Sequence, residues 1–134
     1  MVELVTNVPT LEVLSKCSVE PYDAIYLGNP YCWDYDGNLI SNFNDLEVAI
    51  EMLKEMGKKV YITTFAAPRN ADLPKIFKLI DEALELNVDA IESTNYGVIN
   101  YIKKSTILGF TLAALRTSIH RQLLNYWKIW VLKG

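Results

Sequence analysis

Three stretches of this chain repeat one pattern, in which a short apolar run enters from a turn and leaves into polar residues. They are Tyr22–Gly28, Gly57–Thr64 and Asn87–Thr94, and helix-period sequence separates them. This repetition is typical of β-α units that feed a parallel sheet, whose strands are buried on both faces. It predicts an α/β fold and directs attention to the carboxyl ends of the strands, where such sheets bind ligands.

Apolar runs and helical periodicity predict four strands, each followed by a helix. The predicted strands are Val2–Val5, Ala24–Leu27, Lys59–Thr63 and Ala90–Glu92. Leu11, Leu14 and Cys17 recur at helical spacing and predict the first helix. The second and third helices are predicted in the segments from Asn44 to Gly57 and from Leu73 to Asn87. A short fourth helix is predicted from Val98, Ile99 and Ile102. Asn44 and Glu47 form a capping-box signature, and Pro74 is tolerated in a first helical turn. Tyr31–Phe43 lacks periodicity and is predicted to be a long loop.

Four β-α units make half of a closed barrel, because a (β/α) barrel needs eight strands and about 250 residues. With 134 residues, the chain fits one domain. We therefore expect residues 1–104 to form the amino-terminal half of a (β/α) barrel domain, a partial TIM-barrel-like repeat of about four units around a parallel sheet.

Charge divides the chain unequally. Residues 1–104 contain nine basic and all sixteen acidic residues, a net charge of −7, whereas residues 105–134 contain four basic residues and no acid. Nucleic-acid surfaces need clustered Lys and Arg, so this balance predicts no nucleic-acid partner.

The two cysteines, Cys17 and Cys32, belong to no pair with metal-ligand spacing, which predicts reduced thiols in a cytoplasmic protein. The sequence begins without a signal-peptide pattern. No run approaches the ~20 apolar residues of a membrane span, so no membrane association is expected.

In order and spacing, several blocks of residues 1–104 resemble the collagenase-like peptidases, peptidase family U32. The blocks are Glu3–Val5, Leu11–Leu14, Asp23–Gly28, Gly57–Thr63, Asn87–Ile91 and Tyr96–Val98. The resemblance implies a TIM-barrel-like domain and hydrolysis of a peptide or protein substrate. Some relatives support hydroxylation of RNA or quinone, and some hold an iron–sulfur cluster on four cysteines. Those cysteines have no counterpart here, so no cofactor is expected.

The composition changes after Lys104. Residues 105–134 contain Trp127 and Trp130, no acid and no β-α alternation. A back-translation of Ala113–His120, moved to another frame, encodes Cys-Phe-Ala-Asn-Ile-Tyr-Thr, which resembles the family's fifth block. We therefore hypothesise that residues 105–134 are an aberrant tail, produced by an insertion or deletion near Ile107–Leu112 that ended the protein early.

Polar residues at the predicted carboxyl strand ends are the candidates for facing a ligand. They are Asn7, Asn29, Tyr31, Cys32, Thr63, Thr64, Glu92 and Asn95. Glu92 is the sharpest, since a carboxylate that ends an apolar strand is desolvated and suited to act as a base or ligand. Asn29 and Asn95 have an alternative interpretation as turn or cap residues.

No complete catalytic group emerges from these residues. A Cys32 nucleophile needs a neighbouring base, and the only histidine is His120 in the tail. Asp34 and Asp36 lack the further oxygen ligands of a calcium loop, so no metal site is predicted. The catalytic residues are thus not identifiable.

Three hypotheses for function follow. The first is a truncated peptide-bond hydrolase of the collagenase-like type. The second is a non-catalytic fragment or pseudogene product that self-associates through an open sheet edge. In the third, Leu123, Leu124, Trp127, Trp130 and Val131 form an amphipathic helix that caps the sheet or docks on a partner. A further alternative is a scaffold related to the members that support RNA or quinone hydroxylation.

Overall fold

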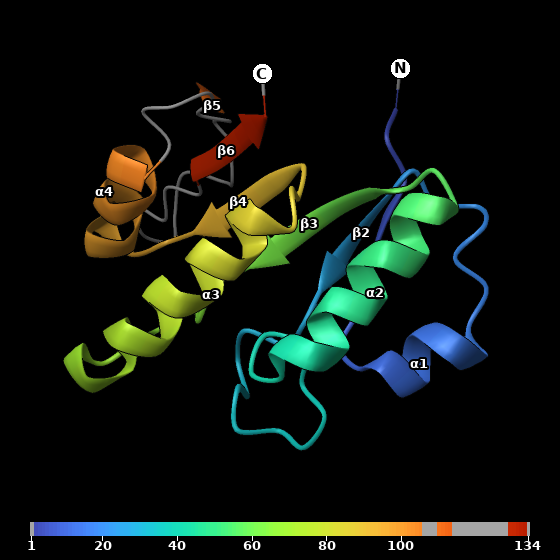
Figure 1. The fold of residues 1–134 in the computed structure, drawn as a ribbon, viewed down its shortest axis with the longest axis horizontal. Helices are drawn as coiled ribbons and strands as arrows, with labels where there is room; N and C mark the ends of the chain where they lie inside the picture. Colours follow the sequence, from blue (N-terminus) through green and yellow to red (C-terminus); the bar gives the residue numbers. More distant parts are fainter. Residues whose placement is uncertain (1, 106–109, 114–128, 134) are drawn as a thin grey trace, which may run out of the picture.

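A computed structural model describes residues 2–105, 110–113 and 129–133. Four strand–helix units come first: β1 (Val5–Val8) and α1 (Leu11–Lys16), β2 (Ala24–Leu27) and α2 (Phe43–Glu55), β3 (Lys59–Thr63) and α3 (Leu73–Glu85), and β4 (Ala90–Ser93) and α4 (Tyr96–Ser105). A single 3-10 turn, η1 (Asn70–Asp72), precedes α3. Two further strands, β5 (Phe110–Ala113) and β6 (Ile129–Lys133), complete the described part (Figure 1).

The sheet has the order β1-β2-β3-β4-β6-β5. Its first four strands are parallel and adjacent in chain order, which confirms the predicted α/β repeat. β6 pairs antiparallel with β4, and β5 pairs antiparallel with β6. The sheet is therefore not closed and not wholly parallel, because the antiparallel pair of β6 and β5 occupies the edge of β4.

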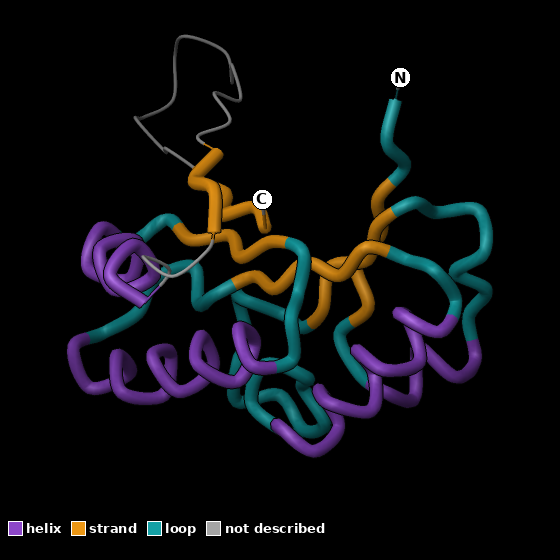
Figure 2. The backbone as a smooth tube through the Cα atoms, turned by 45° about the horizontal axis from the view of Figure 1, so that its top comes forward, coloured by secondary structure: helices purple, strands orange, loops and turns teal. Residues whose placement is uncertain are grey.

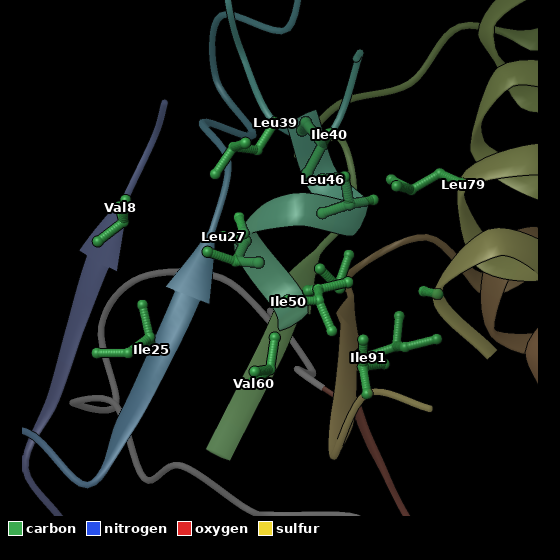
Figure 3. Packing of buried hydrophobic residues seen from close by; sticks show 14 of the residues in the cluster. Val8, Ile25, Leu27, Leu39, Ile40, Leu46, Ile50, Val60, Leu79 and Ile91 are labelled. Atoms are coloured by element: carbon green, nitrogen blue, oxygen red, sulfur yellow. The ribbon is translucent and has the colours of Figure 1, made fainter. Parts of the chain in front are cut away.

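One side of the sheet carries the hydrophobic core. Ile25, Leu27, Val60, Ile62 and Ile91 alternate along the strands and pack against helix residues. Figure 3 shows Ile25, Leu27 and Val60 beside Leu46 and Ile50 of α2. The helices α1, α2 and α3 lie together on this side (Figure 2). Alternating side chains point to opposite faces, so every second strand residue faces away from these helices.

The predicted bounds of β2 and β3 are confirmed, but those of β1 were wrong. We expected Val2–Val5, whereas register with β2 begins at Val5 and continues to Val8. Val2 and Leu4 are 83 % and 53 % exposed, and Val8 is buried. The apolar run that we used for the prediction therefore begins before the strand, and the position of β1 is set by backbone pairing with β2.

Local chemistry explains the helix ends. Thr10 caps α1 by accepting a hydrogen bond from the Val13 backbone at 3.2 Å. The predicted cap of α2 at Asn44 was wrong, because Asn42 Oδ1 accepts from the Asp45 backbone at 3.3 Å and the helix starts at Phe43. The sequence offers the same spacing twice, two residues apart. Beyond α3, Asn87 has a positive φ of 62°, which confirms it as a stop.

The tail falls partly within the described residues. Trp130 and Val131 lie in strand β6, so their predicted place in an amphipathic helix was wrong. Leu123, Leu124 and Trp127 lie outside the described residues. The structure does not test the frameshift hypothesis. Among the described residues, no helix has both the length and the apolar character needed to cross a membrane.

Candidate functional site

The sheet face away from the helices carries aromatic and charged side chains. Strand register places Asn7, Tyr26 and Tyr61 in one row across β1, β2 and β3. Thr63 and Glu92 form the next paired row, on β3 and β4. We call this face the inner face, because in a closed (β/α) barrel the face opposite the helices lines the interior.

Tyr26 and Glu92 form a hydrogen-bonded pair on this face. Glu92 is only 5 % exposed. Burial, the Glu92 charge and a hydrogen bond to its carboxylate raise the pKa of the Tyr26 phenol above its ordinary value. The pair therefore keeps the phenol neutral beside Glu92, and both side chains have oxygen lone pairs that can accept hydrogen bonds from a ligand.

Tyr61 anchors a second carboxylate on the same face. Its hydroxyl donates to Glu3 Oε1 at 3.0 Å, and the Lys59 ammonium lies 2.8 Å from the same oxygen. Burial, followed by the hydrogen bond to Glu3, raises the pKa of Tyr61. The rings of Tyr26 and Tyr61 meet edge to face, with centroids 5.4 Å apart. Two carboxylates thus flank a pair of packed phenols.

Three predicted site residues meet at the ends of β3 and β4. Thr63 is in register with Glu92. Thr64 is 2 % exposed, and its backbone N–H and its hydroxyl both donate to the Glu92 carbonyl, at 3.0 and 3.1 Å. Thr64 therefore secures the backbone that carries Glu92.

The predicted residues Asn7, Asn29 and Asn95 make hydrogen bonds to backbone groups. Asn7 lies inside β1 rather than after it, and its Nδ2 donates to the Gly28 carbonyl at 2.8 Å. Asn29 Oδ1 accepts from the Tyr31 backbone at 3.0 Å, and Asn95 Oδ1 accepts from the Val98 backbone at 3.1 Å. β1 and β4 are three strand spacings apart, about 14 Å, so Asn7 and Glu92 do not adjoin.

Tyr31 and Cys32 lie on the long loop between β2 and α2. Tyr31 is 84 % exposed, and Cys32 is an exposed free thiol. Asn38, which is 1 % exposed, shapes this loop. Its Oδ1 accepts from the Asn29 backbone at 2.9 Å, and its Nδ2 donates to the carbonyls of Asn29 and Cys32 at 3.1 and 3.2 Å. One buried amide thus ties both ends of the turn together.

Sequence reasoning missed Tyr26, Tyr61, Glu3 and Asn38. A signal for the two tyrosines was present, because small or polar residues alternate with Ile25, Val60 and Ile91 along the strands. We had interpreted these runs as uniformly apolar. Asn38 left no comparable signal in its loop. Across residues 2–105, no group of three or more His, Cys, Asp or Glu side chains is placed to hold a metal ion.

Comparison with known proteins agrees with the resemblance found in the sequence. The model of peptidase family U32 matches residues 10–129, which confirms the predicted family and extends past Lys104. The tRNA hydroxylation protein P of Haemophilus influenzae is 23 % identical over 128 residues, covering 94 % of this chain and 28 % of the relative. The Escherichia coli protein of that name is 26 % identical over 102 residues, covering 76 % and 22 %. No solved structure matches the chain significantly.

Proposed function

Because the chain belongs to peptidase family U32, we propose that it forms part of a barrel that acts in tRNA hydroxylation. The observation that carries this proposal is the name shared by the two curated relatives, one of which aligns with 94 % of the chain. The chain spans about a quarter of the length of these relatives, so it supplies one portion of their architecture.

The inner face supports a role in this reaction. Glu92 and Tyr26 place a carboxylate and a neutral phenol on the wall that a barrel turns toward its ligand. Such a pair can position a substrate through hydrogen bonds, and the Glu92 carboxylate is the member suited to act as a general base. The proposal differs from our expectation of no nucleic-acid partner, which rested on the net charge of −7 in residues 1–104. A nucleic acid that is bound mainly through one base needs fewer Lys and Arg side chains on the protein than one that is bound along its phosphates.

Peptide hydrolysis is the second candidate, and the name of the family favours it. Hydrolysis needs an activated nucleophile, a metal-bound water or a carboxylate that activates water. Cys17 and Cys32 are exposed, and the sole histidine, His120, lies outside the described residues. Glu92 is the described group best suited to act as a base.

A chimera tests the proposal. The segment of the Escherichia coli relative that matches this chain is replaced by this chain, and the chimera is expressed in a strain lacking that relative. We expect mass spectrometry of tRNA nucleosides to detect restored hydroxylation. Glu92→Gln removes the charge while keeping the side-chain shape, and we expect it to remove most of the signal.

Glu51→Gln is the matched control, because Glu51 is an exposed residue of α2 on the helical side. This control should leave hydroxylation unchanged. A chimera that is well expressed, leaves tRNA unmodified and cleaves casein or gelatin would instead support the peptidase hypothesis.

A further inference from the structure

The loop between β2 and α2 surrounds a hollow of about 490 Å³. Its walls include Trp33, Tyr35 and Phe43, together with Asp34, Asp36 and Asn44. The volume falls in the range of small-molecule sites. The loop follows the carboxyl end of β2, the end at which (β/α) barrels bind their ligands.

Aromatic rings in the wall are held in place. The Trp33 ring stacks on Phe65, with centroids 4.7 Å apart, and this contact fixes the loop against the buried start of the next loop. Tyr35 is 52 % exposed and stands in the same wall. A ring that is exposed on a fixed loop offers a platform on which another flat ring can stack.

Three polar side chains in the wall of the hollow are not engaged in hydrogen bonds that stabilise the described fold. Within residues 2–105, the side chains of Asp34, Asp36 and Asn44 make no hydrogen bond or salt bridge to another described residue. Carboxylates accept hydrogen bonds from ring and amino N–H groups, and a carboxamide both donates and accepts. These three side chains can therefore bond to the edge of a nucleobase.

Two lysines of α3 flank the hollow. Lys75 Nζ lies 4.1 Å from the centroid of the Trp33 ring, and Lys78 Nζ lies 4.9 Å from that of Phe43. Neither ammonium forms a salt bridge with a carboxylate of residues 2–105. They supply positive charge beside a hollow whose own carboxylates would repel phosphate.

We propose that this hollow binds one unpaired nucleoside of an RNA strand, with the base inside and the adjoining phosphates toward Lys75 and Lys78. This inference rests on the proposed function, since it names where a tRNA substrate would be held. Stacking on aromatic rings and hydrogen bonds to the base edge are the means by which proteins recognise unpaired bases. The base must be unpaired, because in a duplex its edge is paired and its face is stacked, and the proposed site contacts both.

The test measures binding of the 134-residue chain to a fluorescein-labelled, single-stranded RNA octamer by fluorescence anisotropy. We expect Tyr35→Ala and Asn44→Ala each to weaken binding by about tenfold. Lys78→Ala should weaken it and reduce the slope of log affinity against log salt by about one. The same octamer in a duplex should bind more weakly, and free nucleosides should compete with the single strand.

Tyr96→Ala is the matched control, because Tyr96 is 67 % exposed and is not part of the wall. Equal octamer affinity for wild type and Tyr35→Ala, or no binding of RNA, would overturn the inference. Binding of spermidine that depends on Asp36 without binding of RNA would also overturn it and mark a site for organic cations. If the chimera restores hydroxylation but the Tyr35→Ala chain binds the octamer as well as wild type does, the nucleoside site is refuted and the proposed function stands. If the chain binds the octamer but the chimera does not restore hydroxylation, the proposed function is refuted and the nucleoside site stands.

Discussion

Gly28 is the residue whose conformation most tightly constrains the start of the long loop. Its φ is +90°, and a Cβ atom at this position would lie 2.3 Å from Cγ2 of Ile40. Ile40 is itself 2 % exposed and packed in the core, so it has little room to retreat. Both the backbone angle and the contact favour glycine here.

Gly28→Ala should therefore reduce the free energy of unfolding by about 3 kcal/mol, combining positive-φ strain with overpacking. Gly57→Ala provides the control, since Gly57 has a φ of +71° but no atom within 4 Å of the added Cβ. We expect that control to cost about 1 kcal/mol. Urea denaturation measures both, and equal losses would show that the contact with Ile40 contributes nothing.

At the scale of elements, β2, β3 and β4 bring together groups that are distant in sequence. Tyr26 of β2 and Glu92 of β4 interact across β3, and burial is the main cause of the raised pKa of Tyr26. A raised pKa in the folded state means that the native protein holds the phenolic proton more tightly than the unfolded chain does. The resulting stability is present below the ordinary phenol pKa of about 10 and is lost as pH rises above it.

We accordingly expect the free energy of unfolding of Tyr26→Phe to fall less steeply with rising pH above pH 10 than that of wild type. Each such phenol contributes a slope of up to about 1.4 kcal/mol per pH unit above pH 10. Urea denaturation between pH 9 and pH 11 compares the variant with wild type. Tyr31→Phe serves as the control because Tyr31 is 84 % exposed. Parallel curves for wild type and Tyr26→Phe would contradict the assignment.

Prediction of the elements succeeded where the signal was local. Gly57 and Asn87 end their helices through backbone conformations that few residues adopt, and the starts of β3 and β4 follow directly. β1 was misplaced because its position depends on pairing with β2 and the residue that follows it, as in the hydrogen bond from the Gly28 N–H to the Val8 carbonyl. The contact between Tyr26 and Tyr61 likewise depends on strand register, although the alternation along each strand was visible in the sequence.

At the scale of the whole molecule, β1 forms one edge of the described sheet. Its first residue, Val5, is exposed, and so are Val2 and Leu4 just before it. An exposed strand edge with apolar neighbours invites pairing with another strand. The antiparallel pair of β6 and β5 covers β4, so β1 is the one edge formed by a parallel strand of the described sheet, and we propose that the chain self-associates through it.

Sedimentation velocity should then detect a concentration-dependent dimer. Val5→Lys should weaken it about fivefold, equivalent to roughly 1 kcal/mol, because two like charges would face each other across the new pair. Val48→Lys changes an exposed valine of α2 and should have no effect. A wild-type chain that stays monomeric at all concentrations would rule out pairing through this edge.

By itself the sequence determined the alternation of strands and helices and the membership of the family, because periodicity and turn residues act over a few neighbouring positions. It also placed Glu92 at the end of a buried strand. Only the tertiary structure decided that Tyr26 lies against Glu92, that Asn38 closes the loop around the hollow, and that β6 pairs antiparallel with β4. These features depend on register and on contacts between distant segments, whose hydrogen bonds and packing leave no periodic mark in the chain.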